Sequence, residues 1–509
     1  MPSAMDSLTT RPERTEYRET SRYGEVVAFM EAAERASPLI HLTTFGRTNE
    51  GRALPLAIAG RVADASPQAV RASGKTVIYL QGNIHAGEVE GKESLQVLLR
   101  EIAAGQHRAL LDSLVLLIAP IYNADGNERI DASNRPRQHG PVAGMGVRPN
   151  AQGLDLNRDH TKLESPEARG LARMLTEYDP HVVIDLHTTN GTYHGYHLTY
   201  APPLHPNTPP EIDRMLRREW LPAVTEAARR EDGWLLYYYG NVPSAEDGNA
   251  SVERGWYTFD HRPRFGTNYA GLRNRFGVLS EAYSYLTFAE RIRVTSDFVD
   301  RSLAWARAHA TAIRRATEAA DREELRGRPL ALNARRRREG PVTILMGEVR
   351  EEANPLTGHM MLRRVDTVRE ERMPEWQAFD AADTERVPAM YLLPLGMDSI
   401  VDRLRMHGVR VDSVFNVPAG VEVFRIDSTA VAERPFQGHR ERRIHGWWEP
   451  QTLRMTPKMM GVPMDQPLAR LVFTLLEPRS DDGFAAWNLL DPWIEGARSY
   501  PIIRVPAAR

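Results

Sequence analysis

A histidine and a glutamate spaced as His85-x-x-Glu88 are the residues of this sequence best suited to hold a metal ion. They follow the apolar run 76–80, so the pair lies where a predicted strand ends and a helix begins. Imidazole nitrogen and carboxylate oxygen are ligands that Zn²⁺ takes in hydrolytic centres, where three protein ligands leave one position for water. A third ligand must therefore come from elsewhere in the chain.

His187 is the preferred third ligand, because it closes a second strand-like run, 181–187. In an open α/β sheet, ligands bind beyond the carboxyl ends of the strands, so two strand-terminal residues can converge although they are far apart in sequence. The nearby His194 and His197 remain alternatives, as ligands, as substrate contacts or as residues without a role. A lone His-x-x-Glu pair is common by chance, so the hypothesis depends on the motifs that accompany it.

Polar residues between and after the two ligand segments complete the pattern. Asp155 can accept the second N–H of a ligating imidazole. Arg158 offers a planar fork that matches a carboxylate, with Asn157 as an additional donor. Glu281 ends another short apolar run and could act as general base on a metal-bound water. Each has a plain alternative, such as a surface ion pair or an acid that faces water, but their joint order favours a single site.

This succession resembles the zinc carboxypeptidase (funnelin) family, to which carboxypeptidase A belongs. The motifs that carry the resemblance lie in the family's order between residues 25 and 320: the segment 45–52, His85-x-x-Glu88, the turn 120–126, Asp155-x-Asn157-Arg158, and the strand-terminal His187 and Glu281. The resemblance implies one Zn²⁺ per chain, held by His85, Glu88 and His187. It also implies Glu281 as general base and acid, Asn157 and Arg158 as the clamp for the substrate's terminal carboxylate, and Asp155 as the partner of His85.

Two further roles follow from the resemblance, each with two candidate residues. The family uses an arginine upstream of the Asn-Arg pair to stabilise the oxyanion, and Arg135 is preferred here over Arg137. A tyrosine that closes over the substrate should precede the general base, and Tyr269 is preferred over Tyr257. Many members carry an arginine just before the glutamate ligand, where this chain has Gly87, so one positive charge is missing from the expected substrate subsites.

The implied activity is metal-assisted hydrolysis of the C-terminal peptide bond of a peptide or acyl-amino acid that has a free C-terminal carboxylate. Bound Zn²⁺ would lower the pKa of its water to about 7, and Glu281 would pass the water proton to the leaving amine. Two other functions stay open: a related zinc amidohydrolase acting on acyl-amino acids or cell-wall peptides, and an inactive binding protein on the same scaffold. The loop 240–275 should set side-chain specificity, but its charges, Glu253, Arg254, Asp260, Arg262 and Arg264, leave acidic, basic and neutral preferences possible.

Composition is that of a large enzyme without a polyanion or membrane partner. The chain has 509 residues, a formal net charge of −2, no cysteine and no apolar run long enough to span a bilayer. Without cysteine, His, Asp and Glu are left as metal ligands. Residues 1–8 hold no apolar signal core, so the chain as given is not expected to be a secretory precursor. The resemblance favours an extracellular or periplasmic enzyme whose signal peptide was removed, and the alternative is cytoplasmic.

Periodicity predicts an α/β fold, a mixed sheet covered by helices on both faces, followed by a mainly β accessory domain. The expected divisions are an N-terminal extension (1–22), a catalytic domain (23–325), a linker (326–340) that contains the basic run 335–338, and the accessory domain (341–509). Predicted helices are 23–36, 89–104, 166–178, 211–230, 288–319 and 399–407, and predicted strands are 76–80, 114–118, 181–187, 342–346, 389–393, 421–426 and 471–476. Trp447, Trp448, Trp487 and Trp493 could line a binding face, but burial in a core is favoured.

Overall fold

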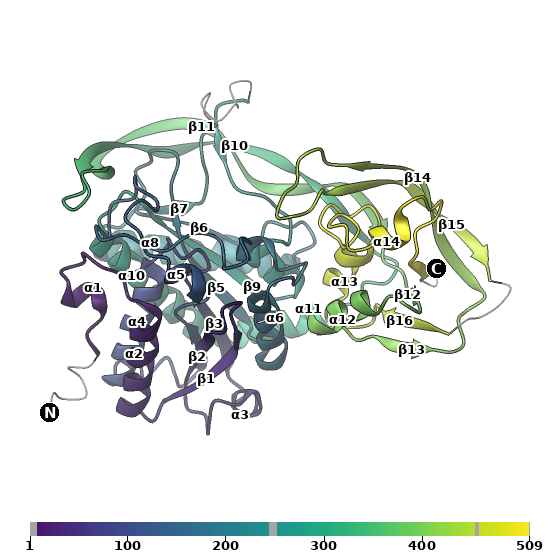
Figure 1. Cartoon of the computed structure of the whole chain (residues 1–509), viewed down its shortest axis with the longest axis horizontal. Coiled ribbons are helices and arrows are strands. Elements are labelled where there is room, and N and C mark those ends of the chain that lie inside the picture. The colour runs from purple at the N-terminus through teal and green to yellow at the C-terminus, as the bar shows by residue number, and fades with distance from the viewer. Residues whose placement is uncertain (1–7, 244–251, 454–457, 508–509) are drawn as a thin grey trace.

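An eight-stranded mixed sheet forms the centre of the N-terminal part of the chain (Figure 1). The structure, a computed structural model, describes residues 8–243, 252–453 and 458–507. The strands, in the order β1-β2-β4-β3-β5-β9-β6-β7, are β1 (Ile40–Arg47), β2 (Ala53–Ala59), β3 (Thr76–Gly82), β4 (Leu114–Ala119), β5 (Val182–Thr189), β6 (Leu198–Ala201), β7 (Leu236–Tyr238) and β9 (Phe276–Tyr283). β4, β3, β5 and β9 run parallel to one another. These strands are buried on both faces, which explains why they appear in the sequence as nearly continuous apolar runs.

Helices cover both faces of this sheet. One hydrophobic core lies against α2 (Tyr23–Ala36), α4 (Glu90–Ala103), α8 (Leu221–Asp232), α10 (Phe288–Ala308) and α11 (Ala310–Asp321). A second core on the other face includes α3 (Pro67–Ala72), α6 (Pro166–Tyr178) and α9 (Gly266–Leu272). Alternate residues of the strands enter the two cores, Ile78 and Leu80 the first, Val77 and Tyr79 the second. The predicted α/β class is confirmed.

Element boundaries match the prediction well near the sheet and less well elsewhere. The predicted helix over 23–36 is observed with those bounds, and α6 begins after Ser165, whose side chain caps it. The predicted helix over 211–230 is divided into α7 (Pro210–Met215), a π-helical turn (Leu216–Trp220) and α8. The one predicted over 288–319 is two helices that meet at His309.

A long β-hairpin lies over the central sheet and extends into the C-terminal part (Figure 1). It consists of β10 (Pro329–Ala353) and β11 (Met360–Arg386), and the short β8 (Trp256–Tyr257) joins β11 in parallel. Much of the segment 326–340, which we expected to be a linker, is therefore strand, and the basic run 335–338 lies within it. The hairpin backbone contacts loops at one end of the central sheet, where Leu362 N donates to Arg137 O at 3.0 Å and Arg364 N donates to Tyr285 O at 2.7 Å.

A six-stranded sheet in the order β13-β16-β12-β17-β14-β15 follows the hairpin. Its strands are β12 (Met390–Pro394), β13 (Asp412–Val414), β14 (Gly420–Val431), β15 (Arg442–Thr452), β16 (Met459–Pro463) and β17 (Ile503–Val505), and it packs with α12 (Asp398–Met406), α13 (Ala469–Leu476) and α14 (Asp491–Ile494). The strand predicted over 471–476 is wrong, because these residues form α13. Trp487 is fully buried, Trp448 and Trp493 pack against the core, and Trp447 alone of the four is exposed.

The described part of the predicted N-terminal extension, residues 8–22, packs on α4. It contains α1 (Arg11–Arg14), and the hydroxyls of Thr20 and Ser21 both donate at 2.7 Å to the buried Glu93 carboxylate. Residues 1–7 lie outside the described part. Among the helices that the structure describes, none has the length and apolar character needed to cross a bilayer.

Candidate metal centre

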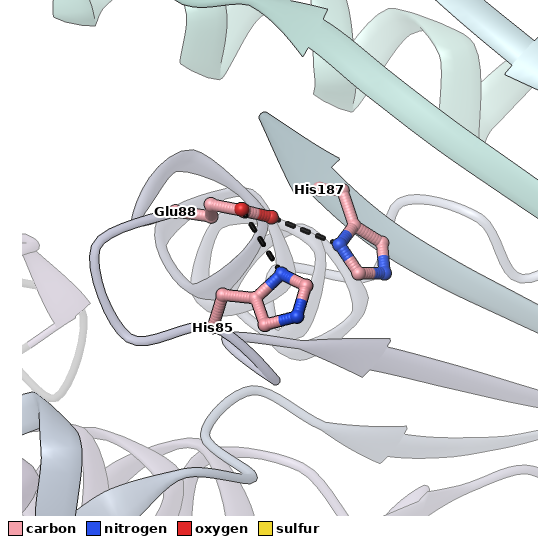
Figure 2. A group of neighbouring side chains, drawn as sticks. All are labelled: His85, Glu88 and His187. Carbon is pink, nitrogen blue, oxygen red and sulfur yellow. Dashed lines mark hydrogen bonds and ion pairs between the residues drawn. The ribbon is translucent and has the colours of Figure 1, made fainter. Parts of the chain in front are cut away.

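His85, Glu88 and His187 meet at the carboxyl ends of two neighbouring parallel strands (Figure 2). His85 and Glu88 lie in the turn between β3 and α4, and His187 lies in β5, where Leu186 is the register partner of Gly82 at the end of β3. One ligand atom of each side chain lies within 4.8 Å of the others, and all three residues are 3% exposed. The three side chains that the sequence predicts as ligands therefore lie together.

Both imidazoles present their Nδ1 atoms to the glutamate. Nδ1 of His85 lies 3.0 Å from Glu88 Oε1, and Nδ1 of His187 lies 2.9 Å from Glu88 Oε2 (Figure 2). The other nitrogens face carboxylates: His85 Nε2 is 3.1 Å from Asp155 and His187 Nε2 is 2.8 Å from Asp185. A carboxylate that accepts the Nε2 proton leaves the Nδ1 lone pair directed at the centre, as a ligating histidine requires. This donor set fits a zinc ion.

The sequence analysis anticipated Asp155 as the partner of His85 but missed Asp185. Asp185 lies two residues before His187 on the same strand, so both side chains point to the same face. The spacing Asp185-x-His187 could therefore have identified Asp185 as a partner of His187 from the sequence. Gln81 Nε2 donates to the second oxygen of Asp185 at 3.1 Å and fixes its orientation.

Nearby positive groups keep the carboxylates of Glu88 and Asp155 ionised. Burial alone would raise the pKa of Glu88, but His85 and Arg135 more than offset it, and the pKa lies well below the usual range. Burial likewise opposes ionisation of Asp155, and the nearby His85 and Arg148 hold its pKa below that of an ordinary aspartate. Deprotonated carboxylates are the forms that bind a cation and orient an imidazole.

Glu281 lies on a third strand, beside His85, Glu88 and His187, which we call the ligand group. It is the register partner of His187 in the parallel pair β5–β9, and both line a cavity of about 480 Å³ with His85 and Glu88. Burial raises the pKa of Glu281 to about 8, and the neighbouring Glu88 adds to this, against the opposing effect of His187 and two arginines. A half-buried carboxyl with a raised pKa beside a candidate metal site is suited to proton transfer.

Two arginines reach the ligand group, one of them expected. Arg135 donates a hydrogen bond to Glu88 Oε1. Arg148, which the sequence analysis missed, lies 3.3 Å from His85 Nδ1 and 3.6 Å from Glu88 Oε1 through its Nη1 atom. Arg137 is exposed, hydrogen-bonds Tyr193 at 3.1 Å and does not line this cavity.

Gly87 explains how Arg135 reaches the glutamate. A Cβ atom at Gly87 would lie 2.8 Å from Cδ and Nε of Arg135, closer than real Cβ contacts allow. The glycine in place of the family's usual arginine therefore makes room for a guanidinium that arrives from another loop.

Asn157 and Arg158 both line the cavity, as expected of a carboxylate clamp. They belong to a short 3-10 turn (Leu156–Arg158) that is capped by Asp155, whose side chain accepts from Asn157 N at 2.9 Å. Asn157 Oδ1 in turn accepts from Gly266 N at 2.9 Å. The Arg158 guanidinium carbon lies over the Phe265 ring, 3.8 Å from the ring centre, and both residues line the cavity.

The tyrosine prediction needs correction. Tyr269 is 2% exposed within α9, its hydroxyl lies 2.7 Å from His407 Nδ1, and it does not line the cavity. Tyr257 stacks on Trp376 at 3.9 Å, also outside the cavity. Tyr239, in the loop after β7, lines the cavity instead.

The alternative histidines lie apart from the ligand group. The ring centre of His194 lies 4.0 Å from that of Tyr283, with the planes tilted by 31°, and burial lowers the pKa of His194 to about 3. His197 Nδ1 accepts from Leu235 N at 3.0 Å. Neither lines the cavity, so His187 is the histidine that β5 delivers to Glu88.

Comparison with known proteins finds similarity to carboxypeptidases. Residues 26–218 match the model of the zinc carboxypeptidase family. Carboxypeptidase 2 of Trichophyton rubrum is 22% identical over 482 residues, which cover 90% of this chain and 81% of that protein. Carboxypeptidase D of Homo sapiens is 32% identical over 154 residues, which cover 26% of this chain and 11% of that protein. A solved metallo-carboxypeptidase from Burkholderia cenocepacia is 18% identical, with a TM-score of 0.42 over 58% of this chain and 71% of that chain.

Proposed function

Because residues 26–218 match the model of the zinc carboxypeptidase family, we propose that this chain is a metallocarboxypeptidase, which hydrolyses the C-terminal peptide bond of peptides with a metal-activated water and Glu281 as general base. The observation that supports this most is the convergence of His85, Glu88 and His187 in one cavity that also holds Glu281 and Arg158. The cavity thus contains candidate metal ligands, a candidate proton acceptor and a candidate carboxylate clamp.

The ligand group would hold a single Zn²⁺ through two imidazole nitrogens and one carboxylate. When bound there, the ion would acidify a water molecule and polarise the scissile carbonyl. Asp155 and Asp185 would keep the ligating histidines in the required tautomer, because each accepts from an Nε2 atom.

Glu281 would take a proton from the attacking water and deliver it to the leaving amine. Its position opposite His187 places it within the same cavity, and a glutamate with a raised pKa transfers protons readily in both directions near neutral pH. Arg135 would stabilise the negative charge that develops on the carbonyl oxygen, and Arg148 lies close enough to the ligand group to share this role.

Arg158 and Asn157 would hold the terminal carboxylate of the substrate. The guanidinium is fixed over Phe265, so its fork is oriented before the substrate arrives, which lowers the entropic cost of binding. This clamp is what would restrict the enzyme to the last peptide bond of a chain.

Blocked dipeptides with a free or an amidated C-terminus test the proposal. We expect the zinc-loaded protein to cleave the free acid at least about 100-fold faster than the amide, since the amide leaves the clamp unpaired. Equal cleavage of both would contradict the carboxypeptidase assignment and favour the amidohydrolase alternative. A Glu281→Gln variant should retain zinc and lose turnover. A wild-type chain that binds zinc without cleaving any substrate would favour the inactive binding protein.

A further inference from the structure

The walls of the metal cavity that are left after the ligands and the clamp are uncharged. They are formed by the polar residues Thr188, Thr189, Asn190 and Thr267 and by Tyr239, Phe259, Phe265 and Leu279. Leu279 lies two residues before Glu281 on β9, so both side chains point into the cavity from the same strand face. Phe259 and Phe265 contact each other, with ring centres 5.2 Å apart. A substrate side chain next to the clamp therefore meets uncharged groups, with apolar surface at Phe259, Phe265 and Leu279.

Every charged side chain that lines this cavity in the described part of the chain already has a proposed role or an ion-pair partner. The acids are Glu88, in the ligand group, and Glu281, the general base. Of the cations, Arg158 belongs to the clamp, and Arg135 and Arg148 contact Glu88 and Asp155. No carboxylate is left to pair with a lysine or arginine side chain, and no guanidinium is left for a glutamate.

The charges of the loop 240–275 are neutralised elsewhere, as far as the structure describes that loop. Residues 244–251 lie outside the described part. The ion pairs are Arg338 with Glu253 at 2.7 Å, Arg254 with Glu371 at 2.6 Å, Arg264 with Asp482 at 2.7 Å, and Arg262 with its neighbour Asp260. None of these charged residues lines the metal cavity. The charges that left the specificity open in the sequence therefore lie outside the metal cavity, and of them only Arg254 lines the neighbouring cavity, which shares Arg135, Asn190 and Tyr239 with it.

We infer that the residue removed from the C-terminus has an uncharged, apolar side chain, aromatic or branched aliphatic. This inference rests on the proposed carboxypeptidase activity. A charged side chain placed against these walls would lose its hydration without gaining a partner, which disfavours it strongly. An apolar side chain would gain from burial against the two phenylalanines and Leu279.

Kinetics on blocked dipeptides that differ only in the last residue test the inference. With zinc-loaded protein, kcat/KM for C-terminal Phe or Leu should exceed that for Lys or Glu by at least about 100-fold. Comparable values for Lys or for Glu would overturn the preference while leaving the carboxypeptidase activity intact. Failure to release any of these residues would instead contradict the proposed function.

A designed charge in the cavity wall sharpens the test. Thr267→Asp introduces a carboxylate at a position that lines the cavity and lies outside the ligand group, base and clamp. It should raise the ratio of Lys to Phe cleavage by about 10-fold or more. Thr267→Asn has the same shape without the charge and should keep the original order. An equal shift in both variants would mean that Thr267 does not face the substrate side chain.

The C-terminal part of the chain reaches the same clamp, which leads to a second inference. Gln437, in the loop between β14 and β15, accepts a hydrogen bond at 2.8 Å from the backbone N of Asp155, the residue that begins the clamp turn. Gln437 has a φ of 51°, a left-handed conformation that is unfavourable for a residue with a side chain. Such strain is retained where surrounding contacts enforce it.

A second set of contacts holds the segment 264–266, which supports Arg158 and Asn157. Arg264 is 2% exposed, and its Nε and backbone N donate to Asp482 at 2.7 and 2.6 Å, while its Nη1 donates to Glu441 at 2.6 Å. The next residue, Phe265, lies beneath Arg158, and Gly266 donates to Asn157. Both segments that form the clamp are thus anchored to the C-terminal part.

We propose that Gln437 is a positioning residue for the carboxylate clamp. Gln437→Leu removes the acceptor for Asp155 N at similar volume and should raise KM for a free-acid dipeptide about 10-fold, with kcat within about 3-fold of wild type. Gln437→Glu keeps an acceptor oxygen and should restore KM. KM for the amidated dipeptide should not change, since the clamp has no carboxylate to hold.

Trp447→Ala serves as a control in the same sheet, because Trp447 is 54% exposed. It should leave KM and kcat unchanged. An unchanged KM in Gln437→Leu, or a parallel change for free-acid and amidated substrates, would overturn the positioning role. A wild-type protein that does not distinguish free acid from amide would contradict the proposed function rather than this inference.

Discussion

Arg135 donates a hydrogen bond to the same Glu88 oxygen, Oε1, that His85 Nδ1 approaches to 3.0 Å. A guanidinium therefore adjoins the ligand group itself, while Arg137, two residues later, points to Tyr193. We expect Arg135→Ala to lower kcat/KM by roughly 100-fold or more, the effect typical of a lost oxyanion donor. Arg137→Ala is the matched control and should change kcat/KM by less than about 3-fold. Equal losses in both variants would contradict the assignment.

Arg148→Ala addresses the arginine that the sequence analysis missed. Because its guanidinium contacts both His85 and Asp155, its loss should lower kcat and also weaken zinc binding, whereas loss of Arg135 should mainly lower kcat. Zinc titration monitored with a competing chelator, together with steady-state kinetics, separates the two effects. A variant with wild-type kcat would remove Arg148 from the mechanism.

Arg158→Ala tests the clamp. The guanidinium lies over the Phe265 ring and lines the cavity, so its loss should reduce cleavage of the free-acid dipeptide by about 100-fold and leave the slow cleavage of the amide unchanged. Zinc content should stay at one ion per chain. A uniform loss on both substrates would show that the residue supports the fold rather than the substrate carboxylate.

The raised pKa of Glu281 predicts a pH-dependent stability of the metal-free protein. The pKa is about 8 in the folded chain and ordinarily 4.5, so the folded state retains a proton that the unfolded state releases between these values. Stability from this group is full below about pH 4.5 and falls as pH rises toward 8. Metal-free Glu281→Gln should therefore be more stable than wild type at pH 8, on the order of 2 kcal/mol, and equal to it near pH 4.5.

Denaturant unfolding of both metal-free proteins at the two pH values measures this difference. Zinc provides an internal control, since a nearby cation favours the ionised carboxylate and should shrink the difference at pH 8. A stability difference that is the same at both pH values would exclude a raised pKa at Glu281.

The carboxylates behind the two histidines should tune metal affinity. Asp155→Asn and Asp185→Asn each remove a negative charge that accepts from a ligating imidazole, and each should weaken zinc binding by about 10- to 100-fold. Competition with a chelator of known affinity measures the change. If Asp185→Asn binds zinc as tightly as wild type, the contact between Asp185 and His187 Nε2 has no role in the zinc affinity.

The sequence predicts the metal centre well because its signals are local. His85, Glu88, His187 and Glu281 each follow an apolar strand run, and parallel strands bring their carboxyl ends to one edge. Tyr269 fails for the opposite reason: helix α9 turns it toward His407, which is 138 residues away in sequence, and no local spacing encodes that contact. Arg148 carried no signal beyond its charge, which it shares with many arginines of the chain.

The C-terminal part shows a different limit of sequence patterns. Residues 471–476 are uniformly apolar, and such a run fits a buried strand and a buried helix equally well. Here all of α13 is buried, so no periodicity distinguishes the two. The segment 326–340 is polar because much of its hairpin is exposed, which hides the strand alternation.

The register pairing of His187 with Glu281 couples two roles through one set of backbone hydrogen bonds. A shift of that pairing by one residue would turn the base to the opposite face of the sheet, so ligand and base are correct together or lost together. Both stem from central, fully covered strands, which open only in near-global unfolding. Heat should therefore abolish peptide hydrolysis at the temperature where the sheet itself melts, with no cooler inactivation step that spares the fold.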